Sequence, residues 1–328
     1  MSRAVHRLLR TALAFLAIAC ASATAADRLY HLKGALNPPV RAVITLDGYS
    51  TTFHGDQVTD NGGHFEFKTL RAGTYMLIVA VPNRGELRRT LEVGPGSTDK
   101  HGVLVLHLTI DEAKLERQAA AQQGTVSLKA LAIPKAAWKA WDRAQRYQGE
   151  GDAEKAIASL KQAVETAPNF SSAWNNLGTL YYKSAQYEKA EEAFRAALDA
   201  EPGSFEPLVN LGGVLLTLND PVRAYDYNLR AVLQRPGDAL ANSQMGMNYY
   251  GLGQLELARK YLNEARHIDL GHFSHPQLLL AEICLRTGDK PGAIRELEEF
   301  LKYHPDAKGR ARVEARIKLL KEALGEML

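Results

Sequence analysis

Residues 174–202, WNNLGTLYYKSAQYEKAEEAFRAALDAEP, decide the fold of this chain. Apolar residues recur every three or four positions in both halves of the stretch, which is the pattern of one buried face on each of two short helices. Pro202 ends the second half, because proline cannot donate the next helical hydrogen bond. The stretch therefore predicts a pair of packed antiparallel helices.

The same pattern returns along the chain at a spacing of 34 residues. Pro168, Pro202 and Pro236 fall at equal intervals, Leu270 takes the next equivalent place, and Pro305 follows after one inserted residue. The small residue of each second helix is alanine, at Ala156, Ala190, Ala224, Ala258 and Ala293. We expect five repeats, at about 137–170, 171–204, 205–238, 239–273 and 274–307, because stacked repeats bury each other's apolar faces.

The repeat resembles the tetratricopeptide repeat (TPR). Its W-x2-L-G-x2-Y, A-x3-F-x2-A and P positions are occupied by Trp174, Leu177, Gly178, Tyr181, Ala190, Phe194, Ala197 and Pro202. The resemblance implies an all-α superhelical solenoid in which Gly178 packs against the alanine of the second helix. Residues 308–328 carry one more apolar stripe, which predicts a helix that caps the last repeat.

A TPR solenoid, by the same resemblance, binds a segment of a partner protein in a concave groove lined by the first helix of each repeat. The groove positions of this sequence are Trp138, Trp141, Asn175, Asn176, Thr179, Tyr182, Asn210, Gln244, Met247, Tyr250, Glu282 and Arg286. Asn176, Asn210 and Gln244 occupy equivalent places, so they either form an amide ladder toward a peptide backbone or bond within the solenoid. Trp141, Val209 and Ser243 stand where a carboxylate clamp needs lysine, which argues against a terminal carboxylate as ligand.

The region 27–110 has an apolar period of two, broken by Gly, Pro, Asn and Asp, and this pattern predicts strands. We expect seven, near 29–36, 42–46, 51–58, 64–69, 75–81, 87–93 and 103–108. Seven short strands suit an antiparallel sandwich of two sheets. The chain is thus predicted to be multidomain, with an N-terminal all-β, Ig- or prealbumin-like sandwich before the TPR superhelix.

Residues 59–77, TDNGGHFEFKTLRAGTYML, resemble the carboxypeptidase regulatory-like family, whose accessory modules have no catalytic residues. That family is grouped with carbohydrate-binding-like folds, so a glycan is a possible ligand. Tyr49, Phe53 and His54 either form an exposed stacking platform for a sugar or serve as core and edge residues. Asp56, Asp60 and Asn61 either offer oxygen ligands to Ca²⁺ or form turns, and their spacing favours turns.

The first 25 residues resemble a signal peptide, with Arg3, Arg7 and Arg10 before an apolar run and Ala23-Thr24-Ala25 as cleavage site. Cys20 follows an imperfect lipobox, which leaves a lipid anchor as an alternative to cleavage after Ala25. Both alternatives imply export to a bacterial periplasm or cell envelope. Residues 111–136 form an alanine-rich, charged linker, and Cys284 is expected to be a packed core thiol.

Charge and motif content argue against several function classes. The net charge is +3, and Arg3, Arg7 and Arg10 account for it, so the rest of the chain lacks the basic stripe that nucleic acids require. The apolar segments are too short to span a bilayer. The sequence shows no metal-ligand spacing, no cofactor motif and no nucleophile beside a base. We therefore expect a non-catalytic scaffold that binds a protein partner, with glycan binding by the sandwich as the alternative.

Overall fold

The computed structural model describes residues 28–49, 51, 53–82, 84–111 and 133–325. The predicted signal peptide, Cys20 and most of the predicted linker lie outside these residues. The first part is a sandwich of seven strands, each within about three residues of its predicted bounds. They are β1 (Tyr30–Asn37), β2 (Val43–Gly48), β3 (His54–Val58), β4 (His64–Leu70), β5 (Gly73–Val81), β6 (Gly85–Val93) and β7 (Val103–Thr109).

The strands form two sheets, ordered β4-β1-β7 and β3-β2-β5-β6. Alternate side chains such as Ile44, Leu77 and Val79 are completely buried between them, as the period of two requires. The expectation of a wholly antiparallel sandwich was wrong, because β1 and β7 pair in parallel, with His31 opposite Val103. The apolar period is the same in both directions, so it could not reveal the direction of a strand.

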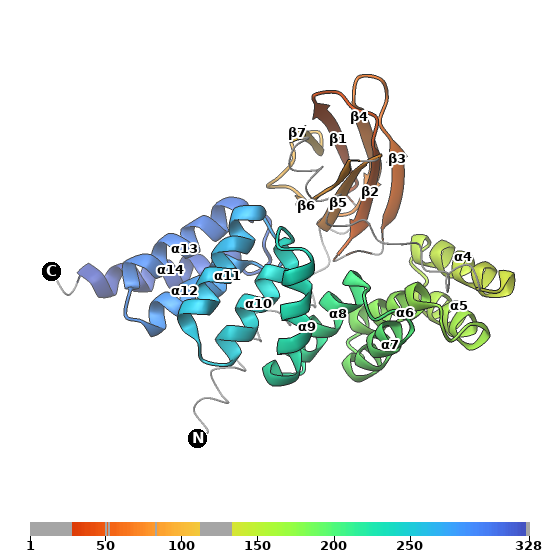
Figure 1. The fold of residues 1–328 in the computed structure, drawn as a ribbon. Coiled ribbons are helices and arrows are strands. Elements are labelled where there is room, and N and C mark those ends of the chain that lie inside the picture. Colours follow the sequence, from red (N-terminus) through yellow and green to blue (C-terminus); the bar gives the residue numbers. More distant parts are fainter. Residues whose placement is uncertain (1–27, 50, 52, 83, 112–132, 326–328) are drawn as a thin grey trace.

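The second part is an array of helix pairs followed by one further helix. The pairs are α4 (Lys135–Gly149) and α5 (Ala153–Thr166), α6 (Ser171–Lys183) and α7 (Tyr187–Ala200), α8 (Phe205–Thr217) and α9 (Pro221–Gln234), α10 (Ala239–Gly251) and α11 (Leu255–Ile268), and α12 (Pro276–Arg286) and α13 (Lys290–Tyr303). The last helix is α14 (Arg310–Gly325), which buries Val313, Ile317 and Leu320 against the fifth pair. The expected fold class, a β-sandwich followed by a helical solenoid, is confirmed (Figure 1).

The close helix crossings depend on glycine, but the expected partner was wrong. A Cβ atom at Gly178 would lie 2.6 Å from the ring of Phe194, and one at Gly246 would lie 2.6 Å from Leu262. The glycine therefore packs under the large residue one turn beyond the alanine. Alanine and the large residue share one helix face, so spacing alone did not separate them. Cys284 is 3% exposed in the core of the fifth pair, as expected.

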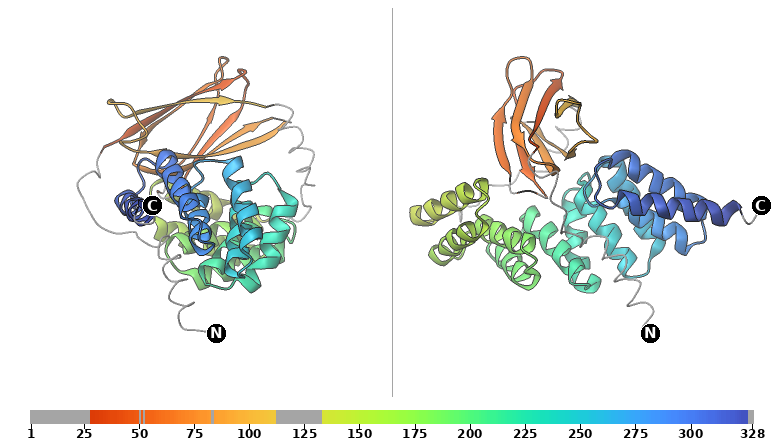
Figure 2. Two further views of the ribbon diagram at one scale, coloured as in Figure 1. Left: turned by 90° about the vertical axis from the view of Figure 1, so that its left-hand side faces the viewer. Right: turned by 180° about the vertical axis from the view of Figure 1, so that it is seen from behind.

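The sandwich lies along the solenoid and touches it at several repeats (Figures 1 and 2). Several Cα atoms of β3 lie within 8 Å of α4, the first helix of the first pair. At the opposite edge of the same sheet, β6 runs beside the loops that lead into α8, α10, α12 and α14. The four-stranded sheet therefore faces the solenoid, and the three-stranded sheet faces away.

Candidate functional site

The first helices of the pairs carry the predicted groove residues, and the structure groups them by neighbouring helix. On α4, Trp138 packs edge-on against Trp141 with ring centroids 5.6 Å apart, and Phe170 lies 4.6 Å from Trp138. Trp138 is 39% exposed, whereas the Nε1 atom of Trp141 is buried. This aromatic cluster forms the start of the row of groove residues.

The expected ladder of equivalent amides is replaced by a different pair. The Asn210 side-chain amide donates to Oδ1 of Asn175, 2.9 Å away on the preceding first helix. Gln244 is 8% exposed and lies against Gly213, where a Cβ atom would be 2.5 Å from its Nε2. Asn176 is half-buried. The polar contact between repeats therefore joins position 175 to position 210, one residue off the predicted register.

Three further groove residues, Tyr182, Thr179 and Met247, lie on α6 and α10. The Tyr182 hydroxyl lies 3.2 Å from that of Thr217 on α8, and the Thr179 hydroxyl donates to its own helix at the Asn175 carbonyl. Met247 is half-buried on α10. The row thus continues without a break from α6 to α10.

At the far end of the row, an arginine covers a tyrosine. The Arg286 guanidinium lies 4.5 Å from the ring centre of Tyr250 and 3.6 Å from the carboxylate of Glu282. Burial raises the pKa of Tyr250 to about 12. The Tyr250 hydroxyl is therefore a neutral hydrogen-bonding group at physiological pH.

Sequence reasoning missed the contacts that the sandwich makes with this side of the solenoid. They come from alternate residues of β6 and from three loops that join one pair to the next. Arg88 lies 3.5 Å from Glu206, the Thr90 amide donates to Asp269 at 3.0 Å, and Glu92 lies 2.8 Å from the His304 ring. Arg235 adds an ion pair to Glu86 at 3.7 Å.

The partners on the solenoid occupy equivalent places. Arg235, Asp269 and His304 are the C-cap residues of α9, α11 and α13, the second helices of successive pairs. Their spacing of 34 and 35 residues is the repeat length itself. The strand β6 thus follows the edge of the solenoid, with one contact at each of three successive repeats. The repeat spacing, combined with the alternation of β6, is the signal that could have suggested this docking.

The end of β2 also contacts the solenoid, at α6 and at the loop before α12. The Lys183 ammonium at the end of α6 donates to the Gly48 carbonyl at 3.0 Å. The Tyr49 ring lies 3.9 Å from that of Phe273, which precedes α12. Tyr49 keeps 43% of its surface exposed, but burial of its hydroxyl raises its pKa, and the neighbouring Tyr182 and Tyr187 raise it further. Gly48 and Tyr49 therefore lie between α6 and the loop before α12.

The candidate ligand residues of the sandwich have structural partners. Phe53 packs against Phe67 and Tyr75 at 6.3 and 5.9 Å, so it and Tyr49 do not share an open platform. His54 is hydrogen-bonded to Asp47, which raises its pKa. Asp60 accepts from the amides of Gly62 and His64, as the turn interpretation predicted.

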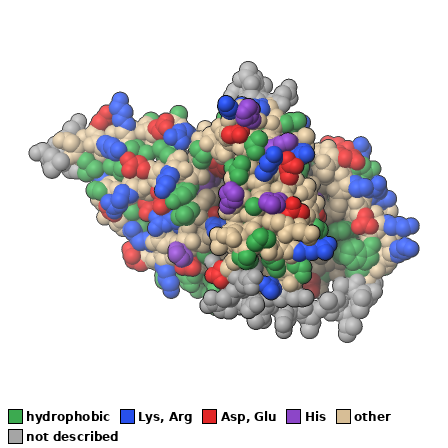
Figure 3. Space-filling model, turned by 90° about the horizontal axis from the view of Figure 1, so that it is seen from above, with side chains coloured by type: hydrophobic (Ala, Val, Ile, Leu, Met, Phe, Trp, Pro, Cys, Tyr) green, Lys and Arg blue, Asp and Glu red, His purple; other side chains and the backbone are tan. Residues whose placement is uncertain are grey.

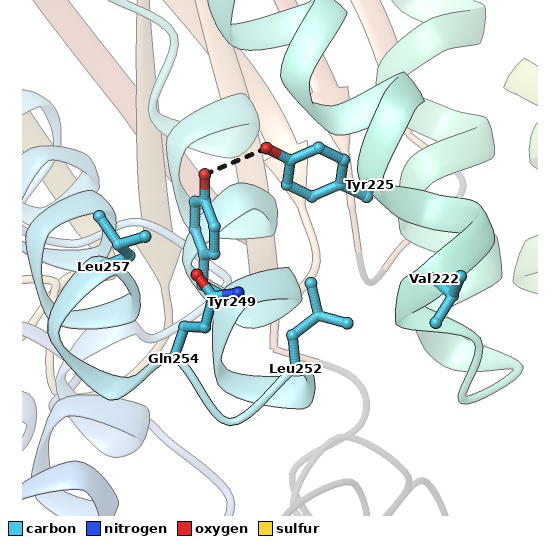
Figure 4. A pocket seen from close by; sticks show the side chains of 6 residues that line it. All are labelled: Val222, Tyr225, Tyr249, Leu252, Gln254 and Leu257. Atoms are coloured by element: carbon cyan, nitrogen blue, oxygen red, sulfur yellow. Dashed lines mark hydrogen bonds between the residues drawn. The ribbon is translucent and has the colours of Figure 1, made fainter.

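A hollow also lies on the helical part, between residues of α9, α10 and α11. A shallow pocket of about 480 Å³ is lined by Val222, Tyr225, Tyr249, Leu252, Gln254 and Leu257 (Figure 4). Its polar feature is the contact of the two tyrosine hydroxyls at 3.4 Å. Figure 3 shows acidic and basic side chains interspersed on the sandwich side of the molecule.

Within residues 28–111 and 133–325, apart from positions 50, 52 and 83, no group of three or more His, Cys, Asp or Glu side chains is arranged to hold a metal ion. In that part of the chain, no helix combines the length and the apolar character needed to cross a bilayer.

Comparison with known families decides the nature of the helix pairs. Two tetratricopeptide-repeat profiles match the chain, one at residues 147–204 and one at residues 176–239. The helix pairs within residues 147–239 are tetratricopeptide repeats. The carboxypeptidase regulatory-like character of the sandwich stays a prediction.

Similar curated proteins match less than half of this chain. The BBSome complex member BBS4 of Xenopus tropicalis is 27% identical over 147 residues, which are 44% of this chain and 28% of that protein. Human protein O-mannosyl-transferase TMTC3 is 27% identical over 194 residues, or 48% of this chain and 21% of that protein. The chain therefore spans less than a third of the length of these relatives.

Solved TPR structures resemble the chain at lower identity. A fragment of MamA from Desulfovibrio magneticus RS-1 is 22% identical, with a TM-score of 0.49, and the match covers 54% of this chain and 99% of that one. The type IV pilus biogenesis factor PilW is 23% identical, with a TM-score of 0.49, over 58% of this chain and 94% of that one. These likenesses concern the fold.

Proposed function

We propose that this protein is an exported, non-catalytic scaffold that binds a segment of a protein partner along the first helices of its tetratricopeptide repeats. The observation that carries the proposal is a continuous row of half-buried side chains on successive first helices. Asn175, Thr179, Asn210, Met247 and Glu282 belong to four different repeats and are all partly accessible. Export rests on the signal-like sequence of residues 1–25.

The chemistry of the row suits an extended or helical peptide. The side-chain amides of Asn175 and Asn210 both donate and accept hydrogen bonds, so they can pair with a peptide backbone of any sequence. Trp138 and Met247 add apolar surface that adapts to varied side chains. The mixed charge near Glu282 and Arg286 favours no single-signed ligand.

Site-specific photo-crosslinking tests the proposal. The photoreactive p-benzoyl-phenylalanine replaces Thr179 or Met247 in the full chain, expressed in its native cells. Asp226 on α9 is the matched control, because it is exposed on a second helix. We expect a discrete protein adduct from both groove positions and none from position 226. Adducts from position 226 alone would place the binding surface elsewhere.

Two further measurements complete the test. With the captured partner purified, the double substitution Asn175→Ala/Asn210→Ala is expected to weaken binding about tenfold, by removing two net hydrogen bonds. Unchanged affinity would contradict a role for the amides. Mass spectrometry of the mature protein should find Ala26 as the first residue, and a chain that still begins at Met1 would contradict export by signal cleavage.

A further inference from the structure

The contact between sandwich and solenoid is polar and imperfectly satisfied. Among the described residues, three buried side-chain polar atoms of this contact have no hydrogen-bond partner. They are Glu92 Oε2, Arg235 Nε and Asp306 Oδ2. A buried polar atom without a partner costs about 1–3 kcal/mol relative to its hydrated state. Closure of this contact is therefore opposed by the desolvation of its own atoms.

The attractive interactions across the contact are mostly polar, and they include the hydrogen bond from Lys183 to the Gly48 carbonyl. The amides of Thr90 and Gly96 donate to Asp269 and Asp306, at 3.0 and 2.6 Å. Arg88, Glu86 and Glu92 contribute ion pairs, and the stacking of Tyr49 on Phe273 is the aromatic contact between the two parts. Each domain also has its own hydrophobic core. Polar interfaces between separately cored domains favour relative motion of the domains.

We propose that the sandwich is a reversibly docked lid over the side of the solenoid that carries the groove row, and that it opens as one body to admit the partner. The strand β6 holds the lid closed, with one contact at each of the C-caps of α9, α11 and α13. The Gly48–Tyr49 segment lies over the end of α6, beside Tyr182. Opening returns the three unpaired atoms to water, which lowers the free-energy cost of opening. The claim that opening admits the partner rests on the proposed function. The claim that the sandwich docks reversibly does not.

Amide hydrogen exchange of the free full-length protein, resolved by NMR, tests the lid without any partner. The amides of Thr90 and Gly96 are reporters, because their acceptors lie on the solenoid. The amide of Leu77, in the central strand β5, reports unfolding of the sandwich itself. We expect both reporters to exchange at least about tenfold faster than Leu77. Exchange of Thr90 at the rate of Leu77 would overturn the proposal.

A substitution remote from both reporters tests whether the lid moves as one body. Arg235→Ala removes an ion pair at the far end of β6 and touches neither reporter amide. We expect Thr90 and Gly96 to speed up by the same factor while Leu77 is unchanged. Arg195→Ala on α7 is the control, because Arg195 pairs with Glu191 within its own helix. If the two reporters respond independently, the contact frays locally and the lid does not exist.

A reversible lock gives a second, independent readout. A Cβ atom at Gly96 would lie 3.2 Å from Cγ of Asp306, so Gly96→Cys with Asp306→Cys is placed to form a disulfide. The lock is made with Cys20→Ser, and Cys284 stays because it is buried. Oxidation should slow exchange at Thr90 about tenfold, and reduction should restore it. No difference between the two forms would overturn the proposal, whereas failed crosslinking at Thr179 would count against the proposed function alone.

Discussion

Glu92 of the sandwich and His304 of the solenoid lie 2.8 Å apart, although 212 residues separate them in the sequence. The other nitrogen of the His304 ring lies 3.4 Å from the ring of His275. His272 is close by, 1% exposed and bonded to Ser274. Three histidines and a carboxylate thus share the junction of the two domains.

This junction predicts that stability falls on mild acidification. Burial, together with the charge of His304, lowers the pKa of His272 and of His275 to about 3. Unfolded histidine titrates near 6.5, so the unfolded chain takes up protons first. The stabilising contribution is complete above pH 6.5 and is lost progressively between pH 6.5 and pH 3. Burial raises the pKa of Asp269, an opposite effect that becomes important only near the acid end of this window.

The measurement is the free energy of unfolding in urea at pH 7 and pH 5. We expect a decrease of about 2 kcal/mol for each of the two histidines. His272→Asn should reduce the difference between the two pH values. His267→Asn is the control, because His267 is exposed on the same edge of the solenoid, and it should leave the difference unchanged. Equal stability at both pH values would show that these rings are solvated.

Ala185 offers a site for stabilisation. Its φ angle is 56°, in the left-handed region, where the other pairs place Gly151, Asn219, Gly253 and Gly288. Alanine in this region costs about 1 kcal/mol relative to glycine. Ala185→Gly should therefore raise the free energy of unfolding by about that amount, and Gly253→Ala should lower it similarly. A fall in stability on Ala185→Gly would contradict the strain.

Gly178 tests the helix crossing of the second repeat. A Cβ atom there would lie 2.6 Å from the ring of Phe194, which is 2% exposed and has little room to move. Gly178→Ala should cost about 1–3 kcal/mol of unfolding free energy. At Gly203, where no atom lies within 4 Å of the added carbon, the same change should cost little. The comparison requires both thermal and urea unfolding, and equal effects at the two sites would refute the packing argument.

The contact of Asn175 with Asn210 couples two repeats. A double-mutant cycle with alanine at both positions should give an interaction free energy of about 0.5–1.5 kcal/mol. The hydrogen bond joins Asn210 to Asn175 and not to the adjacent Asn176. The cycle of Asn176→Ala with Asn210→Ala should therefore be additive. Additivity in the first cycle would mean that the 2.9 Å hydrogen bond adds nothing to stability.

The sequence determined the local architecture. Trp174, Gly178 and Phe194 mark positions of a pattern that recurs about every 34 residues. This recurrence specified helix pairs, because each pair buries its faces against its neighbours in the chain. The alternation in β2 and β5 specified strands with a buried face for the same local reason. The candidate groove residues followed from the repeat, since a position in the repeat fixes a position on the solenoid.

The tertiary structure decided what these local patterns leave open. It alone set the parallel pairing of β1 with β7, the shift of the amide contact to Asn175, and the docking of β6 on the C-caps. Thr90 and Asp269 carry no local signal, because a backbone amide on an edge strand and a carboxylate after a helix occur in many sequences. Their hydrogen bond depends on the relative position of two domains that each have their own core. No short stretch of the sequence determines that relative position.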